Sequence, residues 1–112
     1  MTIRDVCETL SASVVCGDDT RSFEGVYVGD LLSRAMSHVG CDNLWITIMS
    51  NTNVVAVATL TEPAAVILAE SVSLQEDARK SAEKNGITVL SSPLSAYELC
   101  ARLSRLGAEQ EI

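Results

Sequence analysis

The sequence predicts one α/β domain over residues 1–112, in which helices pack on a parallel or mostly parallel β-sheet. Short apolar segments alternate with segments whose apolar residues recur at helical spacing, an order typical of such sheets. Residues 44–49 are apolar on both faces except at Thr47, which indicates a strand in the middle of the sheet. Of the 112 residues, 47 % are apolar and 21 % are charged, a balance that suits a single folded core.

The residues before this strand predict two helices and the start of the sheet. Turn residues follow the first strand, and Gly40 ends the second helix, which carries Asp30 in its first turn. The expected elements, in order, are a helix over residues 3–10, a strand over 13–16, an extended segment over 23–27 and a helix over 29–39.

Residues 54–61 are ambiguous. Their β-branched side chains are typical of a strand, whereas Asn53 is a good N-cap for a helix. The next strand is expected over residues 65–69, and a parallel strand pair needs a crossover of a dozen or so residues. We therefore expect a short buried helix at 54–61, with a strand as the alternative.

The last third of the chain has clear helix signals. Ser73 and Glu76 have the spacing of a capping box, and Ser92 followed by Pro93 is typical of a helix start. The expected elements are a helix over residues 73–85, a strand over 87–90 and a helix from Ser92 to about residue 106, with residues 108–112 frayed.

The charge balance excludes several functions. A formal net charge of −7 without a basic patch disfavours nucleic acids and anionic membranes as partners. No apolar stretch is long enough to span a membrane, and no signal peptide is visible, so we expect a cytoplasmic protein. Only Asp42 carries a charge between residues 35 and 61, which marks this stretch as the centre of the fold or as part of an interface.

The cysteines give no sign of a metal or a catalytic centre. Cys7, Cys16, Cys41 and Cys100 form no Cys-x-x-Cys pair, and His38 is the single histidine. Phosphate-binding glycine motifs and a nucleophile elbow are also missing. We expect no metal, no cofactor and no enzymatic activity, with most of the cysteines packed as small apolar side chains, Cys100 in particular.

Five phrases of the sequence resemble the DRTGG domain family, and in particular its small stand-alone members. They are residues 27–33, 44–48, 53–58, 65–68 and 86–99, in unbroken order within residues 25–106. The pentapeptide Asp-Arg-Thr-Gly-Gly that names the family is absent, and Asp19-Thr20-Arg21 only partly resembles it. Any role tied to that pentapeptide therefore stays open.

The resemblance implies a regulatory module. Relatives accompany CBS domains in some inorganic pyrophosphatases and precede the catalytic part of some phosphotransacetylases. A similar fold opens the HPr kinase/phosphorylases and resembles the N-terminal domain of Mur ligases. Stand-alone members occur in anaerobic bacteria near iron hydrogenase genes, and the family is not known as an enzyme by itself.

A ligand is expected at the carboxyl ends of the strands, where open parallel sheets bind their ligands. Polar and small residues follow the predicted strands there, at 17–19, 50–53, 70–71 and 91–92, and helix N-termini next to them have free N–H groups that favour anions. We select Ser50, Thr52, Asn53 and Ser92, with Asp30 in the first turn of its helix, while noting that capping alone explains such residues.

Two functions fit these observations. The first is a non-catalytic regulatory module that senses a small anion, such as a nucleotide, and acts through a partner protein. The alternative is a dimerisation or scaffold module without a ligand, favoured by the almost uncharged centre and the small side chains at residues 54–58. A homodimer is compatible with both and is the commonest oligomer.

Overall fold

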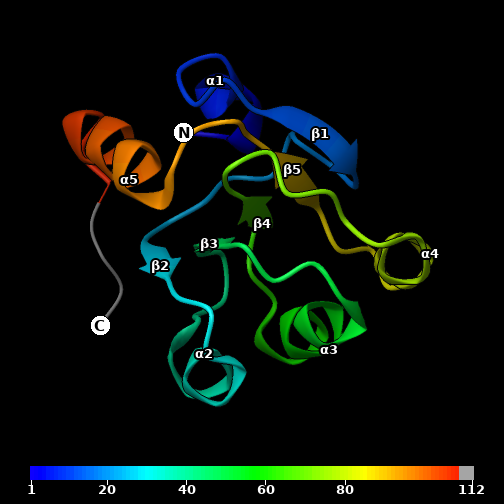
Figure 1. The fold of residues 1–112 in the computed structure, drawn as a ribbon. Helices are drawn as coiled ribbons and strands as arrows, with labels where there is room; N and C mark the ends of the chain where they lie inside the picture. Colours follow the sequence, from blue (N-terminus) through cyan, green and yellow to red (C-terminus); the bar gives the residue numbers. More distant parts are fainter. Residues whose placement is uncertain (109–112) are drawn as a thin grey trace.

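The computed structural model describes residues 1–108, which form a five-stranded sheet between two layers of helices (Figure 1). The predicted α/β class is confirmed. Residues 109–112, most of the segment expected to be frayed, lie outside the described residues. The elements are α1 (Ile3–Cys7), β1 (Ser13–Cys16), β2 (Val26–Val28), α2 (Leu32–His38), β3 (Leu44–Thr47), α3 (Thr52–Thr61), β4 (Ala65–Leu68), α4 (Glu76–Lys84), β5 (Val89–Ser91) and α5 (Ala96–Arg105).

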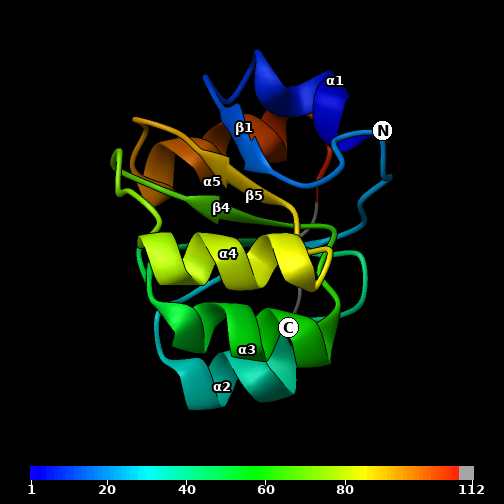
Figure 2. The same ribbon diagram turned by 90° about the vertical axis from the view of Figure 1, so that its right-hand side faces the viewer.

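The strands lie in the order β1-β5-β4-β3-β2. Strands β2 to β5 are parallel and adjacent in chain order, whereas β1 pairs antiparallel with β5. Because these parallel strands advance across the sheet in one direction, right-handed crossovers place α2, α3 and α4 on the same face. Figure 2 shows these three helices on one side of the sheet and α1 with α5 on the other.

Two apolar cores result, one on each face of the sheet. Successive residues of a strand alternate between them, so Trp45 packs toward α2, α3 and α4, while Leu44 and Ile46 pack toward α1 and α5. Trp45 is fully buried, and its indole Nε1 donates to the carbonyl oxygen of Gly29 at 3.0 Å. This hydrogen bond satisfies the polar atom of the largest core side chain.

The ambiguous segment is a helix, as expected. Helix α3 buries Val54, Val55, Val57 and Ala58. It lies between α2 and α4 and also rests on the sheet, so apolar side chains are needed on most of its circumference (Figure 2). Burial on several sides therefore outweighs the strand preference of its β-branched residues.

Two predicted starts of helices on this face were wrong by two residues. The N-cap of α3 is Asn51 rather than Asn53, and its side-chain oxygen accepts from the Asn53 amide at 3.1 Å. The N-cap of α4 is Gln75, so the capping box expected from Ser73 does not start this helix. The Gln75 amide donates to the carbonyl oxygen of Ser50 at 3.0 Å, and this contact with the β3–α3 loop sets where α4 begins.

The start of α5 was wrong by three residues. Ser95 is its N-cap and accepts from the Glu98 amide at 3.2 Å. Ser92 is buried instead, and its hydroxyl donates to the carbonyl oxygen of Leu10 at 2.6 Å. The Ser92 hydroxyl, which was expected to cap the helix, thus bonds to a residue far away in the sequence.

The segment around β2 also differs from the expected bounds. The strand covers Val26–Val28 rather than residues 23–27, and α2 begins at Leu32 rather than at Gly29. Asp30 therefore precedes the helix and does not lie in its first turn, contrary to the prediction. The Gly29 amide still donates to the Ile46 carbonyl oxygen at 3.1 Å, so this residue continues the sheet and cannot start the helix.

Candidate functional site

The sheet has loops at the amino ends of its parallel strands and loops at their carboxyl ends. These two sets of loops differ in how tightly they are joined. At the amino ends of β3 and β4, the Arg21 guanidinium donates to the Asp42 carboxylate at 2.9 Å and to the carbonyl oxygens of Glu62 and Pro63 at 3.1 and 3.3 Å. These hydrogen bonds occupy the polar groups of that edge. The carboxyl ends of the parallel strands are therefore the edge where a ligand is expected.

The turn after β1 lies at the amino edge, contrary to expectation. Residues 17–19 were placed among the strand ends that face a ligand, on the assumption that β1 is parallel. Because β1 is antiparallel to β5, this turn meets the start of β5, where the Asp18 amide donates to the Thr88 hydroxyl at 2.9 Å.

Asp30 connects the ends of β2 and β3. Its carboxylate oxygen Oδ1 accepts from the Thr47 hydroxyl at 2.7 Å and from the Ile48 amide at 2.9 Å. The Thr47 hydroxyl in turn accepts from the Met49 amide at 3.2 Å. Asp30 therefore fixes the loop that leads from β3 into α3, which is a structural role compatible with a nearby ligand.

The β3–α3 loop brings three of the selected residues together. Ser50 is half-buried, and Thr52 and Asn53 are exposed in the first turn of α3. These residues lie at the start of a ten-residue helix, where backbone N–H groups lack partners within the helix. Together with Asp30 below the loop, these residues form what we call the β3–α3 edge: Asp30, Ser50, Thr52 and Asn53.

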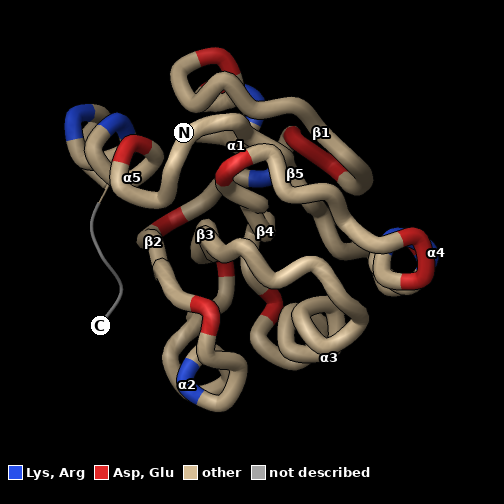
Figure 3. Tube along the Cα trace, viewed as in Figure 1, with Lys and Arg blue, Asp and Glu red and all other residues tan. Residues whose placement is uncertain are grey.

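The charges at the helix starts distinguish α3 from α4 and α5. Helix α4 has Glu76 and Asp77 in its first turn, and α5 has Glu98, so their own carboxylates complement the helix dipole. Helix α3 has no acidic residue in its first turn. Figure 3 shows this helix without charged residues along its length, next to the mixed charges of α4. Of these three helix starts, that of α3 therefore has no first-turn carboxylate that would repel an added anion, and the acidic group of the same edge is Asp30.

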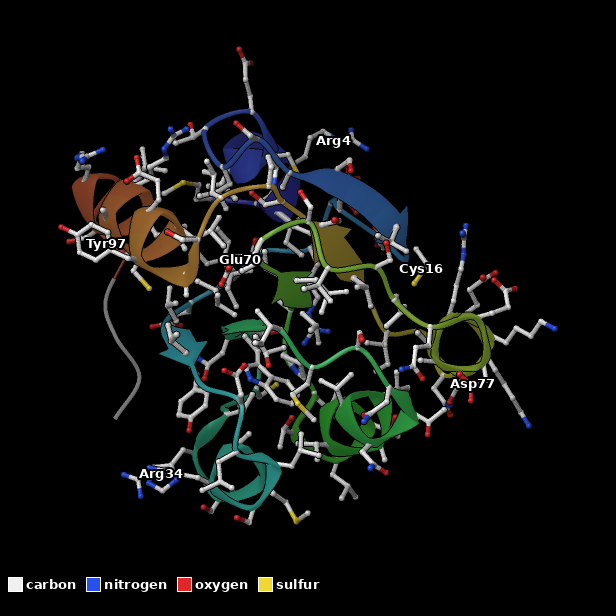
Figure 4. The ribbon with its side chains drawn as sticks, in the orientation of Figure 1. Arg4, Cys16, Arg34, Glu70, Asp77 and Tyr97 are labelled. Atoms are coloured by element: carbon white, nitrogen blue, oxygen red, sulfur yellow. The ribbon has the colours of Figure 1, made fainter. Side chains whose placement is uncertain are left out.

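A crevice between β4 and β5 is closed. The chain turns to one face of the sheet after β4 and to the other after β5, and such a divergence usually opens a ligand crevice. Here the amides of Glu70 and Ser71 donate to the carbonyl oxygens of Leu94 and Ser92, both at 2.9 Å. Glu70 and Ser71 both have a φ of 58°, so this closure holds two successive residues in the left-handed region (Figure 4).

Ser92 lies apart from the β3–α3 edge. Its side chain faces α1, is 1 % exposed and also accepts from the Leu94 amide at 3.2 Å. The choice of Ser92 rests on its neighbour Pro93, because a Ser-Pro pair often precedes a helix. Its partner Leu10 is 82 residues away, so local pattern reasoning could not find that contact.

A groove that the sequence analysis missed lies between β2 and α5. It has a volume of about 450 Å³ and is mainly apolar. Tyr97, at the start of α5, lines it and is 81 % exposed, and Figure 4 shows its ring on the outer side of the helix. The signal was present in Val26, within the extended segment predicted over residues 23–27, and Val28, just after it, because apolar residues two positions apart share one face of a strand. The groove is lined by Val26, Val28, Ala96, Tyr97, Cys100, Leu103, Ser104 and Ala108.

The thiols have the electrostatics of core residues. Burial raises the pKa of Cys7, Cys16 and Cys100, which is opposite to the shift that a nucleophilic cysteine needs. Cys41 is exposed. In residues 1–108, no three His, Cys, Asp or Glu side chains are grouped so that they could hold a metal ion.

The fold and this edge define a small three-layer α/β domain that presents polar loops at the carboxyl ends of its parallel strands. The chain belongs to the DRTGG domain family, whose model matches residues 5–106. This confirms the family resemblance found in the sequence. No curated protein matches the chain.

A solved relative shares this fold. It is the regulatory region of Clostridium perfringens pyrophosphatase, containing CBS and DRTGG domains and complexed with the activator diadenosine tetraphosphate. The two structures superpose with a TM-score of 0.76 at 18 % sequence identity, over 91 % of this chain. The match covers 45 % of the relative, so this chain corresponds to less than half of that regulatory region. Within the described part of this chain, none of the helices has the length and apolarity to cross a membrane.

Proposed function

We propose that this protein is a non-catalytic regulatory module that binds a small anionic ligand of the nucleotide class at the β3–α3 edge. One observation carries the proposal: α3 is a ten-residue helix whose exposed start bears Thr52 and Asn53 and no acidic residue. The helix dipole and the N–H group of Thr52 attract phosphate groups to such a helix start, while the Asn53 amide already donates to the Asn51 side chain.

The family supports the class of ligand. A DRTGG-containing region of similar fold is complexed with a dinucleotide activator, diadenosine tetraphosphate. We therefore take adenine nucleotides as the first candidates for this chain. Asp30 positions the loop in this proposal, Thr52 and Asn53 contact the phosphates, and Ser50 borders the site. Ser92 is not included, because its buried hydroxyl already has two partners.

We further propose that the bound ligand acts through a partner protein. The β3–α3 loop contacts the start of α4 through Ser50 and Gln75, and it contacts the end of β2 through Asp30. A ligand that orders this loop therefore stabilises surfaces on two neighbouring elements.

Thermal unfolding in the presence of nucleotides tests the proposal. A ligand at one hundred times its dissociation constant stabilises the fold by about 2.7 kcal/mol. For a domain of this size that is roughly a 10 °C rise in Tm, at about 4 °C for each kcal/mol. We expect this rise with ATP or diadenosine tetraphosphate, and we expect Asn53→Ala to remove most of it.

A matched control uses the other end of the sheet. Asn85 is exposed at the end of α4, where its side-chain amide donates to the Ser81 carbonyl oxygen at 2.8 Å. Asn85→Ala removes the same chemical group far from the β3–α3 edge and should leave the ligand-induced rise intact. An equal loss in both variants, or no rise with any nucleotide, contradicts the proposed site.

A further inference from the structure

The outer edge of β2 has unused hydrogen-bonding groups. On the side of β3, the Gly25 carbonyl oxygen accepts from the Leu44 amide at 3.0 Å. The Gly29 amide donates to the Ile46 carbonyl oxygen at 3.1 Å. Because residues of a strand face alternate neighbours, Val26 and Val28 direct their N–H and C=O groups away from β3. In residues 1–108 these four groups make no hydrogen bond.

The two outer strands of the sheet differ in their protection. The edge formed by β1 has an irregular register between Val14 and Cys16, a feature that discourages pairing with another strand. Strand β2 pairs with β3 in regular register and contains neither proline nor lysine. Within residues 1–108, the short length of β2, three residues, is therefore its main protection, and this edge is open to a further strand of similar length.

Exposed apolar side chains gather around the same edge. Val28 is 36 % exposed at the end of β2, Leu31 follows it at 66 %, and Ile48 at the end of the neighbouring strand is 44 % exposed. The apolar groove between β2 and α5 opens beside Val28, with Tyr97 on its wall. Exposed groups of this kind at an unpaired edge are typical of an interface.

We propose that β2 pairs antiparallel with β2 of a second copy of this chain, around a two-fold axis at Tyr27. In this register Val26 of one copy lies opposite Val28 of the partner subunit. By symmetry, Val28 of the first copy lies opposite Val26 of the partner subunit. Each pair exchanges two hydrogen bonds, so all four outward groups of each copy gain a partner. The proposal does not depend on nucleotide binding.

The sequence of the strand suits a second copy as the occupant. Val-Tyr-Val reads the same in both directions, so the antiparallel partner presents the same side chains in the same order. The paired valines lie on one face of the joined sheet, the face covered by α5, so the two apolar grooves become continuous.

One pair of charges opposes this dimer. The same register brings Glu24 toward Asp30 of the partner subunit, at both ends of the paired strands. Like charges that lie opposite each other weaken strand pairing, and salt screens them. The dimer is therefore expected to become tighter as the salt concentration rises.

Sedimentation velocity with two variants at one position tests the pairing. We expect the wild-type chain to sediment as a dimer of the 11.9 kDa protomer at high concentration. Val28→Pro removes an outward N–H and leaves the bonds to β3, because proline is tolerated at the open side of an edge strand. It should sediment as a folded monomer, whereas Val28→Thr keeps the N–H and the branched shape and should still dimerise.

Amide hydrogen exchange of the wild-type chain supplies an independent measurement. The amides of Val26 and Val28 should exchange more slowly as the protein concentration rises, while the amide of Tyr27, which faces β3, should not change. A monomer at concentrations up to about 1 mM overturns the proposal. So does a dimer whose Val26 and Val28 amides stay unprotected, or a folded Val28→Pro that remains dimeric.

Discussion

The carboxylate of Asp30 accepts a hydrogen bond from the hydroxyl of Thr47 at 2.7 Å and thereby joins the end of β2 to the end of β3. Thr47 is 2 % exposed, so its hydroxyl depends on partners within the protein. The same carboxylate oxygen also accepts from the Ile48 amide at 2.9 Å. This acidic side chain holds the loop on which the proposed nucleotide site is built.

Removal of this carboxylate should destabilise the fold. Asp30→Ala leaves the buried Thr47 hydroxyl and the Ile48 amide without their acceptor, at an expected cost of about 2 kcal/mol. Asp30→Asn keeps an acceptor oxygen but loses the charge, so roughly half of that cost is expected. Urea unfolding measures both values. Glu24→Ala is the control, since that exposed side chain has no partner in the described residues. Equal stability of Asp30→Ala and Glu24→Ala would contradict the structural role of the Asp30 carboxylate.

Gly17 should tolerate no side chain. Its φ is 95°, and an added Cβ would overlap the Cα and Oγ1 atoms of Thr88. Gly86 has a φ of 68° with open space around it, so Gly86→Ala isolates the cost of backbone strain. We expect Gly17→Ala to lower the free energy of unfolding by at least about 2 kcal/mol more than Gly86→Ala does. Similar values in urea unfolding would show that the β1–β5 contact is looser than described.

Stability should fall on the acid side. Hydrogen bonds from the Thr20 hydroxyl and then the Thr20 amide lower the pKa of Asp18, and the Thr2 amide lowers that of Asp5, in both cases below the ordinary value of 3.8. A lowered pKa stabilises the fold above that ordinary value, and the contribution is lost as the pH falls through the folded pKa. Asp18→Asn cannot titrate, so its stability should change less between about pH 5 and pH 2.5. Equal pH slopes for the two proteins would contradict the assignment.

The thiols should differ in reactivity. Cys41 is exposed, whereas burial raises the pKa of Cys7, Cys16 and Cys100 above the ordinary value of 9.0. Iodoacetamide at about pH 8 should therefore modify Cys41 first, since the thiolate is the reactive form. Peptide mass spectrometry gives the order, and unfolding in urea should make the four rates similar. Modification of Cys100 as fast as Cys41 in the folded protein would contradict the packing of α5.

The sequence predicted the centre of the fold well, because the evidence there is local. Residues 44–46 and 65–68 are continuously apolar, and a parallel pair of strands requires the helical crossover that α3 provides. The direction of β1 could not be read in the same way. Its antiparallel pairing with β5 depends on contacts between Ser13 and Ser91, which no local pattern encodes.

The candidate site was predicted in part for the same reason. The loop residues Ser50, Thr52 and Asn53 follow directly from the end of β3 and lie together at the start of α3. Ser92 was selected by its neighbour Pro93, but the structure commits its hydroxyl to Leu10. The role of Asp30 was also not visible, since Thr47 lies 17 residues further along the chain.

Mapping of backbone amide signals by NMR during a titration with diadenosine tetraphosphate tests the proposed function most directly. We expect the largest shifts at the amides of Thr52 and Asn53, smaller ones at Ile48 and Ser50, and none at Asp18 and Thr88 on the opposite edge of the sheet. The same titration with Asn53→Ala should need much higher nucleotide concentrations. Shifts confined to the groove between β2 and α5, or no shifts at saturating nucleotide, would contradict an anion site at the start of α3.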